Sequence, residues 1–491
     1  MSDPEMGTIN CKKIMYLIRV FVGIILCCSP FHGCYADANQ PQTQSKKQMQ
    51  PNAVLSSSFV FPLSGNVFPM GYYYATVDLG DPPKPYYLDV DSGSDLTWVQ
   101  CDAPCKHCRK QPHPLYKPNN NQVPCKDPAC AALYWPERPP CKGDTRCEYE
   151  VAYADQGSSK GMLVKDVFRL TLTSGTIISS NLVFGCGFDQ QAPETHPPPF
   201  VDGVLGLGFG KSSIIQQLNV LGLTRRVIGH CLSGKGGGYL FFGDNHLPPG
   251  ITWEPFSSNT LNHYVAGPVD LLPLGGQGGA KDLTLIFDSG STYTYLQSQA
   301  YKATLQMISK DLEGKGFKLA PDDHALPVCW KGPEPFRSPS DANKYFKPLI
   351  LQFKKTMNKL EIPPEAYLIS TPKLNVCLGI LNGAEAGLGD TNLIGDISMQ
   401  NKMVIYNIET KKIGWLNADC SNSPNLVTSS AKFRSSTAAA EANSLAYEAS
   451  SKRSRVSLYK SATKGSKKQQ FVVASVFHDM EETTPQIIVY S

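Results

Sequence analysis

The sequence predicts an all-β protein made of two lobes. Three observations favour this class: the chain length, the turn-rich composition, and one tetrapeptide that occurs twice. A chain of 491 residues is too long for one hydrophobic core, and its 41% hydrophobic residues can fill two. The 41 Gly, 38 Pro and 10% aromatic residues suit many short strands joined by turns.

The repeated tetrapeptide is Asp-Ser-Gly-Ser, which begins at Asp91 and again at Asp288. Each copy follows an apolar, strand-like run, and each half contains a later apolar segment with glycine, at residues 202–208 and 392–396. Glycine in such a segment lets one backbone pass close to another. Because the order of motifs repeats, we expect two lobes of one plan, with one carboxylate from each lobe.

The N-terminus predicts a signal peptide over residues 1–38. Two lysines precede an apolar stretch at residues 14–28, and small residues follow it. A membrane anchor is the alternative interpretation. Arg19 interrupts the stretch, which is shorter than the ~20 residues that span a bilayer, so we expect no membrane span in the mature chain.

The rest of the chain divides into four predicted parts. Residues 39–53 are expected to be a linker or short prosegment, 54–245 the N-terminal lobe, 246–425 the C-terminal lobe, and 426–491 a disordered tail. The stretch after Cys420 carries nine Lys or Arg against five Asp or Glu, which accounts for the formal net charge of +4. The remainder is neutral, so nucleic-acid binding is not expected except through this tail.

The cysteines favour disulfide bonds. Sixteen are present, and the twelve that follow the predicted signal peptide form an even number. Seven of these lie between Cys101 and Cys147. The spacing of Cys105 and Cys108, with His107 between them, leaves zinc ligation as an alternative. Disulfides are preferred because thiolates rarely stay reduced outside the cytosol, and with the signal peptide they predict the secretory pathway.

Two carboxylates held close together support hydrolysis. They cannot both ionise at low cost, so Asp91 and Asp288 are expected to share one proton over a wide acidic range. The ionised member can draw a proton from a water molecule, while the protonated member hydrogen-bonds the carbonyl oxygen of a peptide bond. This chemistry cleaves an amide without a covalent intermediate, and it needs no metal or organic cofactor.

The other motif residues are expected to support the two aspartates. Gly93 and Gly290 are expected to allow the tight turns. The hydroxyls are expected to donate to the outer carboxylate oxygens, from Ser94 and Ser291, and to reach the opposite turn, from Ser92 and Ser289. One such tetrapeptide usually marks an ordinary turn, whereas two copies in the same context favour a paired site.

On these motifs the chain resembles the pepsin-like aspartic endopeptidases, and within them the plant nepenthesin and nucellin-like group. Trp98, seven residues after Asp91, and the order of the two apolar segments with glycine also match the family. The resemblance covers roughly residues 70–420. It implies the bilobal pepsin-like acid protease fold, with two β-barrel-like lobes and an active site in the cleft between them. It also implies a monomer that hydrolyses polypeptides at acidic pH, outside the cell, in the cell wall or in the vacuole.

Two further segments match this group. The cysteine-rich region 101–147 is similar to the nepenthesin insertion, the twelve cysteines fit that group's six disulfides, and a pairing of Cys329 with Cys377 suits the family. The segment after Cys147 resembles the flap hairpin, so Tyr153 is expected to be the flap tyrosine, with its hydroxyl near Trp98. Ala154 replaces the usual glycine, and an extra residue near Gln156 is expected to alter the flap tip.

Two alternatives to a plain protease stay open. One is a non-catalytic binding protein on the same fold, such as the plant inhibitors of cell-wall-degrading glycosidases, which are expected to have damaged dyads. The other is a protease whose basic tail also binds nucleic acid. Metal and serine hydrolysis are not supported, because the nine His lack ligand spacing and no serine lies in a G-x-S-x-G context.

Overall fold

The computed structural model describes residues 57–421 except 144, 192–198, 246, 258–262 and 277, together with the backbone of Ile487–Val489. The predicted signal peptide and linker lie outside the described residues. So does the predicted tail, apart from that short strand.

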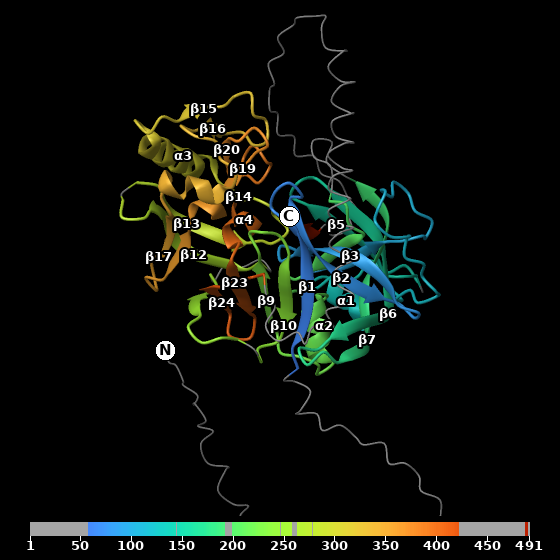
Figure 1. The fold of residues 1–491 in the computed structure, drawn as a ribbon. Coiled ribbons are helices and arrows are strands. Elements are labelled where there is room, and N and C mark those ends of the chain that lie inside the picture. The colour runs from blue at the N-terminus through green and yellow to red at the C-terminus, as the bar shows by residue number, and fades with distance from the viewer. Residues whose placement is uncertain are drawn as a thin grey trace, which may run out of the picture. The chain divides into compact units, whose positions relative to one another are not determined.

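The described residues form many short strands and few helices (Figure 1). The first eleven strands are β1 (Phe59–Asn66), β2 (Tyr72–Leu79), β3 (Lys84–Asp91), β4 (Trp98–Gln100), β5 (Glu148–Tyr153), β6 (Ser158–Thr171), β7 (Ile177–Gln191), β8 (Gly203–Gly206), β9 (Val227–Leu232), β10 (Gly238–Phe242) and β11 (Thr252–Pro255).

The next strands are β12 (Val265–Pro273), β13 (Ala280–Phe287), β14 (Thr294–Leu296), β15 (Lys318–Leu319), β16 (Cys329–Lys331), β17 (Leu349–Phe353), β18 (Lys359–Ile362), β19 (Leu368–Ser370), β20 (Val376–Leu378), β21 (Ile380–Asn382), β22 (Asn392–Ile394), β23 (Lys402–Asn407), β24 (Lys412–Asn417) and β25 (Ile487–Val489). The helices are α1 (Pro128–Leu133), α2 (Ile214–Val220), α3 (Ser298–Leu312) and α4 (Asp396–Met399), with 3-10 turns η2 (Pro339–Lys344) and η3 (Pro364–Ala366).

The strands assemble into three sheets. The largest has the order β11-β24-β23-β9-β10-β1-β2-β3-β8-β4-β7-β6-β5-β25, and an extra β2–β6 pairing closes part of it into a ring. The second has the order β18-β17-β12-β13-β22-β14-β21, and the third β15-β16-β20-β19. The prediction of an all-β, bilobal fold is confirmed.

The two lobes repeat one strand arrangement. In the first, β3 runs parallel to β8, which lies antiparallel to β4, and β4 runs parallel to β7. In the second, β13, β22, β14 and β21 take the same places with the same directions. The strand that leads into each Asp-Ser-Gly-Ser turn therefore lies beside the apolar segment with glycine from its own lobe.

One sheet crosses the predicted lobe boundary at residue 246. Strands β11, β23 and β24 come after that boundary, yet they continue the sheet of the first lobe through β9. Figure 1 shows β9, β23 and β24 between the lobes. The disulfide Cys231–Cys420 and the hydrogen bond from Gln400 Nε2 to Tyr73 Oη, at 3.1 Å, also join early and late parts of the chain. The lobes thus share a central sheet that places their two turns against each other.

Alternation along β3 separates the core from the cleft. Leu88 and Val90 are fully buried in the main hydrophobic core, as period-2 patterning predicts. Tyr87, Asp89 and Asp91 point to the other face and line the space between the lobes. The same alternation in β2 buries Tyr73 and Ala75 in the core and leaves Tyr72 and Tyr74 lining the cleft. A core strand thus carries functional groups on one face only.

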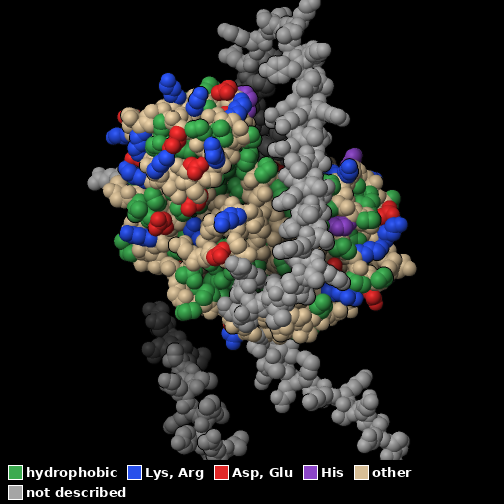
Figure 2. Space-filling model, in the orientation of Figure 1, with side chains coloured by type: hydrophobic (Ala, Val, Ile, Leu, Met, Phe, Trp, Pro, Cys, Tyr) green, Lys and Arg blue, Asp and Glu red, His purple; other side chains and the backbone are tan. Residues whose placement is uncertain are grey.

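Charged side chains are mixed over the visible surface. On the face shown in Figure 2, Lys and Arg side chains lie among Asp and Glu side chains on the C-terminal lobe, without a single basic patch there. Within the described ranges, no helix combines the length and the apolar character that crossing a bilayer requires.

Candidate active site

The two predicted aspartates lie together in the interior, and Asp91 lines the space between the lobes. Asp91 ends β3 and Asp288 directly follows β13, so the matching strands bring the two carboxyl groups close enough for each to influence the pKa of the other. Both residues are buried, with 2% and 0% of their surface exposed. The two halves of the chain thus contribute one carboxyl group each to a single site.

Each carboxyl group has the same two partners from its own turn. The backbone N–H of Gly93 donates to Asp91 Oδ1 at 2.8 Å, and that of Gly290 donates to Asp288 Oδ1 at 3.0 Å. The Ser94 hydroxyl donates to Asp91 Oδ2, and the Ser291 hydroxyl donates to Asp288 Oδ2 at 3.0 Å. These bonds fix the carboxyl planes and favour the ionised form.

The remaining serines join the two turns. Ser92 N donates to Ser289 Oγ at 3.1 Å, and Ser289 N donates to Ser92 Oγ at 2.9 Å. The hydroxyls continue across, from Ser92 to the carbonyl of Phe287 at 3.1 Å and from Ser289 to the carbonyl of Val90 at 2.8 Å. Since all four bonds cross between lobes, the relative position of the aspartates is fixed by buried hydrogen bonds.

Glycine is needed at position 290 because of a close approach. A Cβ there would lie 2.5 Å from Asp91 Oδ1, so any other residue at position 290 would displace the Asp91 carboxyl group. Neither Gly93 nor Gly290 has the left-handed backbone that usually calls for glycine in a turn. The expected reason for these glycines, a tight turn, is therefore incomplete: at Gly290 the opposing carboxyl group itself excludes a side chain.

Burial governs the protonation of the pair. Desolvation raises the pKa of Asp91 from 3.8 to about 6, although hydrogen bonds from Ser94 and Gly93 act in the opposite direction. Desolvation, followed by the charge of Asp91, raises the pKa of Asp288 well above its ordinary value. The pair therefore retains a proton at pH values where free carboxyl groups are ionised.

Two more buried carboxyl groups accompany the pair. Asp396 begins α4, and its backbone N–H donates to the carbonyl of Ser291 at 2.8 Å. Asp89 lies two residues before Asp91 in β3. We call Asp89, Asp91, Asp288 and Asp396 the carboxyl cluster. Desolvation, then neighbouring carboxyl charges, raise the pKa of both Asp89 and Asp396.

Sequence reasoning missed these two residues. Asp396 belongs to the second apolar segment with glycine, in which only the glycine was given a role. Asp89 lies in an apolar run that predicts a buried strand. The period of two along that strand could have indicated Asp89, because it places Asp89 and Asp91 on one face.

A cleft of about 1640 Å³ adjoins the dyad, and Asp91, Gly290 and Ser291 line it. Its lining comes from both lobes and includes Tyr74, Tyr87 and Trp98 from the first and Tyr293 and Leu326 from the second. A space of this volume and mixed polarity exceeds the usual size of a small-molecule pocket and suits a polymer with several side chains.

A hairpin of β5 and β6 carries Tyr153 into this cleft. The indole N–H of Trp98 donates to Tyr153 Oη at 2.6 Å. Desolvation and the charge of Asp91 raise the pKa of Tyr153, so its hydroxyl stays protonated and can donate in turn. The contact predicted between the hydroxyl of the flap residue Tyr153 and Trp98 is therefore present, and both residues line the cleft.

The tip of this hairpin has an unusual turn. Gln156 has φ of 72°, in the left-handed region that favours glycine. Its N–H donates to the carbonyl of Tyr153 at 3.0 Å, and the N–H of Gly157 donates to Asp155 Oδ1 at 2.7 Å. The extra residue expected near Gln156 is therefore accommodated by one left-handed residue and a side-chain hydrogen bond.

Replacing Tyr153 with phenylalanine is expected to lower kcat/KM about 2- to 10-fold, because one hydrogen bond contributes about 0.5–1.5 kcal/mol. Without its acceptor, the Trp98 N–H no longer fixes the position of the Tyr153 ring in the cleft. Peptide cleavage at acidic pH measures the effect. Tyr134→Phe is the matched control. Tyr134 Oη donates to the carbonyl of Glu148 at 2.9 Å, and Tyr134 does not line the cleft. Equal losses in both variants would contradict a role specific to Tyr153.

The cysteine-rich insertion lies beside the same cleft. All twelve described cysteines pair, as Cys101–Cys186, Cys105–Cys108, Cys125–Cys141, Cys130–Cys147, Cys231–Cys420 and Cys329–Cys377. The predicted disulfides are thus confirmed, including Cys329–Cys377. Because Cys105 and Cys108 bond each other, they are not available as zinc ligands.

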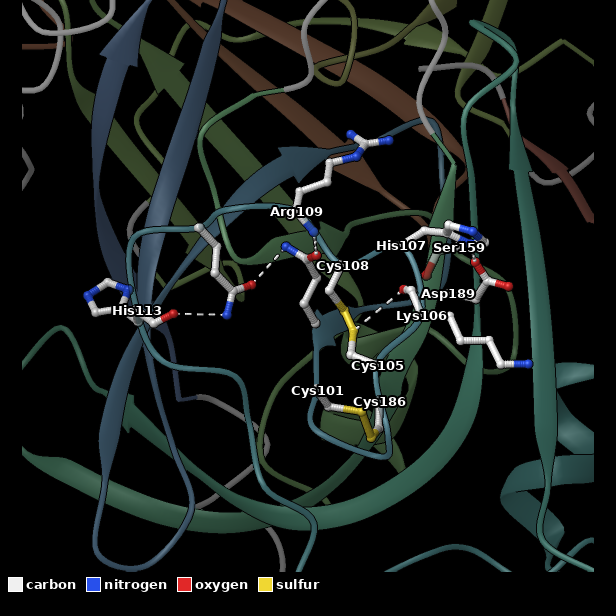
Figure 3. The surroundings of a disulfide bond; sticks show 12 residues. Cys101, Cys105, Lys106, His107, Cys108, Arg109, His113, Ser159, Cys186 and Asp189 are labelled. Atoms are coloured by element: carbon white, nitrogen blue, oxygen red, sulfur yellow. Dashed lines mark hydrogen bonds and ion pairs between the residues drawn. A yellow bond between two sulfur atoms is a disulfide. The ribbon is translucent and has the colours of Figure 1, made fainter.

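Figure 3 shows how the short Cys105–Cys108 loop connects to its surroundings. His107 Nδ1 lies 2.7 Å from Asp189 Oδ1, and the backbone N–H of Arg109 donates to Gln100 Oε1 at 2.8 Å. Arg109 and Gln100 both line the cleft. The insertion therefore supplies part of the cleft wall on the side of the first lobe.

Comparison with known families matches most of the described chain. A family model described as "Xylanase inhibitor N-terminal" matches residues 73–244, and one described as "Xylanase inhibitor C-terminal" matches residues 273–416. Together they span both lobes.

Similar curated proteins are plant aspartic proteinases. The chain is 43% identical over 384 residues to an aspartic proteinase of Oryza sativa subsp. indica, covering 75% of this chain and 93% of that protein. It is 30% identical to "Aspartic proteinase 36" of Arabidopsis thaliana, covering 76% and 79%. It is 26% identical to "Aspartic proteinase nepenthesin-1" of Nepenthes gracilis, covering 71% and 78%.

Among solved structures, basic 7S globulin from soybean superimposes with a TM-score of 0.58 at 18% identity, covering 76% of this chain and all of that one. Conglutin gamma from lupine seeds gives 0.56 at 17% identity, covering 75% and 96%. These two likenesses concern the pepsin-like fold alone. With the fold, the two matched Asp-Ser-Gly-Ser turns and relatives that span both lobes, the chain belongs to the plant pepsin-like aspartic protease family.

Proposed function

We propose that this protein is a working aspartic endopeptidase in which Asp91 and Asp288 activate water. The observation that carries the proposal is the paired carboxyl site with its complete set of supporting hydrogen bonds. Each carboxyl group keeps both partners from its own turn, and both serines keep their bonds across the lobes. A binding protein has no need of this symmetric arrangement.

The first chemical step follows from the shared proton. The ionised carboxylate accepts a proton from a water molecule held between the two groups, and the oxygen of that water attacks the carbonyl carbon of the peptide bond. The other carboxyl group donates its hydrogen bond to the carbonyl oxygen, which stabilises the negative charge that develops there. Both groups lie in a buried site, where such interactions are stronger than in water.

The second step returns the proton. The carboxyl group that took the proton from water gives it to the leaving nitrogen, the C–N bond breaks, and the dyad regains its single shared proton. No covalent bond forms between protein and substrate. The flap hairpin with Tyr153 is proposed to cover the substrate during these steps and to exclude water from the site.

The substrates are proposed to be polypeptides bound in extended form. The volume of the cleft and its lining from both lobes support several subsites, and the family's named aspartic proteinases support the same class of substrate. The six disulfides and the predicted signal peptide support the secretory pathway, with the cell exterior, cell wall or vacuole as the final compartment. We propose a monomer of the nucellin-like group.

The competing function is a binding protein for glycosidases, because the matched family models are described as xylanase inhibitor domains. The two functions make different demands on the dyad. Inhibition of a glycosidase through a surface contact would not depend on Asp91 or Asp288, whereas proteolysis requires both. The intact turns favour the protease.

The test is cleavage of a denatured protein by the purified chain from pH 3 to pH 7, with xylanase inhibition measured in parallel. We expect cleavage that peaks at acidic pH, is blocked by a statine-type transition-state inhibitor, and is accompanied by no effect on xylanase. A folded, disulfide-bonded protein that cleaves nothing at any pH but inhibits xylanase would replace this proposal with the competing one.

A further inference from the structure

Asp89 occupies a place on the cleft floor that the catalytic proposal does not use. In β3 the side chains of Tyr87, Asp89 and Asp91 line the cleft, while those between them enter the core. Residues two apart in a strand are separated by about 7 Å, which is also the spacing of alternate side chains in an extended peptide. A substrate held over Asp91 therefore places a side chain near Asp89 within two positions of the scissile bond.

Aromatic and apolar side chains surround this carboxyl group. Tyr74 lies opposite Asp89 on β2, and Val204 lies opposite it on β8. The rings of Tyr74 and Tyr87 pack with their centroids 4.7 Å apart, and both line the cleft. The site is thus a carboxyl group beside tyrosine rings, which suits the long apolar stem and cationic end of Lys or Arg.

One oxygen of Asp89 lacks the partner that buried carboxyl oxygens normally have. Asp89 is 9% exposed, and its Oδ1 atom has no hydrogen-bond partner among the described residues, although the backbone N–H of Val90 bonds the carboxyl group. None of the ion pairs between described residues includes Asp89. Burying such a group is costly unless something compensates it. Asp323, another buried carboxyl group in the cleft lining, is instead bonded by Thr371 and Asn375 at 2.6 and 2.9 Å.

We propose that Asp89 is a specificity-determining residue that selects a Lys or Arg side chain within two residues of the scissile bond. The inference rests on the proposed endopeptidase function and names a class of substrate for it. The cationic end of the substrate side chain donates hydrogen bonds to the Asp89 carboxylate, and its stem packs on Tyr74 and Tyr87. Glu and Asp at the same substrate position are disfavoured by repulsion.

The surrounding charges set how this selectivity varies with pH. Asp91 on the same strand and Asp396 at the start of α4 are the carboxyl groups that act on Asp89, Tyr74 faces it from β2, and β8 contributes the uncharged Val204. An arriving ammonium group stabilises the ionised form of Asp89. Preference for Lys should therefore increase as the pH rises within the active range.

The experiment compares the full chain with its Asp89→Asn variant on peptides that differ at one position. Lys, norleucine and Glu are placed in turn at each of the two positions on either side of the scissile bond, and kcat/KM is measured at two pH values. Norleucine keeps the stem of Lys without the charge. Glu385→Gln is the matched control, because it removes one exposed negative charge from the rim of the same cleft.

We expect a preference for Lys over norleucine of at least about tenfold at one position, since a hydrogen bond to a charged group contributes about 1.5–3 kcal/mol. Asp89→Asn should bring that ratio close to one while cleavage of the norleucine peptide continues, and Glu385→Gln should leave the ratio unchanged. Equal ratios in the wild type and Asp89→Asn would overturn the inference. The inference would also be overturned if Asp89→Asn shifted the pH dependence of kcat/KM equally for the Lys and the norleucine peptides, because Asp89 would then act only on the dyad.

Binding of statine-type peptides separates this inference from the proposed catalytic function. Tighter binding of the Lys form than of the norleucine form, lost in Asp89→Asn, would support the subsite even if no peptide were cleaved. In that case only the endopeptidase proposal would fail. Absence of any difference in binding between the Lys and norleucine forms would overturn the subsite.

Discussion

Replacing either Asp91 or Asp288 with asparagine is expected to reduce peptide-bond cleavage by at least about 10³-fold. General acid–base catalysis by one positioned group contributes about 10²–10⁴-fold, and here a single proton serves both roles. With asparagine at one position, the remaining carboxyl group titrates alone and no partner is left to take the second role.

Asparagine preserves most of the local structure. Its side-chain oxygen can still accept the N–H of Gly93 or Gly290, which lie 2.8 and 3.0 Å from the present carboxylate oxygens. The bonds between Ser92 and Ser289 do not involve the aspartates and should persist. We therefore expect the variants to lose activity but to stay folded. Circular dichroism spectra and thermal unfolding in the absence of inhibitor, compared with those of the wild type, measure this.

The matched control is Asp127→Asn. Asp127 caps α1 by accepting the N–H of Ala129 at 2.8 Å, and asparagine is an equally good capping residue. This variant should keep full activity. If Asp91→Asn or Asp288→Asn cleaved peptides as fast as the wild type did, the dyad mechanism would be wrong.

The protein is expected to lose stability as the pH rises from 4 to 7. In the carboxyl cluster, burial raises the pKa of every member, to about 6 for Asp91. A carboxyl group with a raised pKa in the folded state keeps its proton where the unfolded chain has lost it. The folded state then binds more protons, so the free energy of unfolding falls as the pH rises through the window from 3.8 to about 6 and beyond.

The effect is large because several groups act in the same direction. For Asp91 alone, a rise from 3.8 to about 6 corresponds to about 3 kcal/mol. Groups with a lowered pKa act in the opposite direction. Desolvation lowers the pKa of His230 to about 3 and also lowers that of His263, and hydrogen bonds lower the pKa of Asp311, Asp323, Glu334 and Asp341. Desolvation raises the pKa of Asp95 to about 6, so this residue adds to the carboxyl cluster, and we expect the buried groups to outweigh the opposing ones.

Urea unfolding of the disulfide-bonded protein at pH 4, 5.5 and 7 measures this dependence. The Asp288→Asn variant, which has one group fewer to ionise, should be more stable than the wild type at pH 7 and should show a flatter pH dependence. A wild-type protein that is more stable at pH 7 than at pH 4 would contradict the assignment of buried, proton-holding carboxyl groups.

Local patterns were sufficient to predict the class of fold and the residues of the two turns. The Asp-Ser-Gly-Ser motifs, the strand runs before them and the apolar segments with glycine each depend on neighbouring residues, and each predicted element is present. The hydrogen bonds of Ser92, Ser94, Ser289 and Ser291 are also found, while their contribution to turnover stays a prediction.

Features that depend on distant residues could not be predicted. The central sheet joins β9 to β23, whose paired residues Met403 and Cys231 lie far apart in the sequence. The approach of Asp91 to the Cβ position of Gly290, and the place of Asp396 near Asp89 and Asp91, arise only when the two lobes face each other. Alternation along β3 places Asp89 on a face, but only the packed structure shows that this face is the cleft.

Active-site titration with a statine-type inhibitor tests the central claim most directly. The purified full chain, at known concentration and pH 4, is mixed with increasing inhibitor while peptide cleavage is followed. We predict that activity falls linearly to zero at one inhibitor per chain, and that Asp91→Asn and Asp288→Asn show neither activity nor titration. Activity that persists beyond one equivalent, or a folded wild-type chain with no activity to titrate, would contradict the account of one catalytic dyad in each molecule.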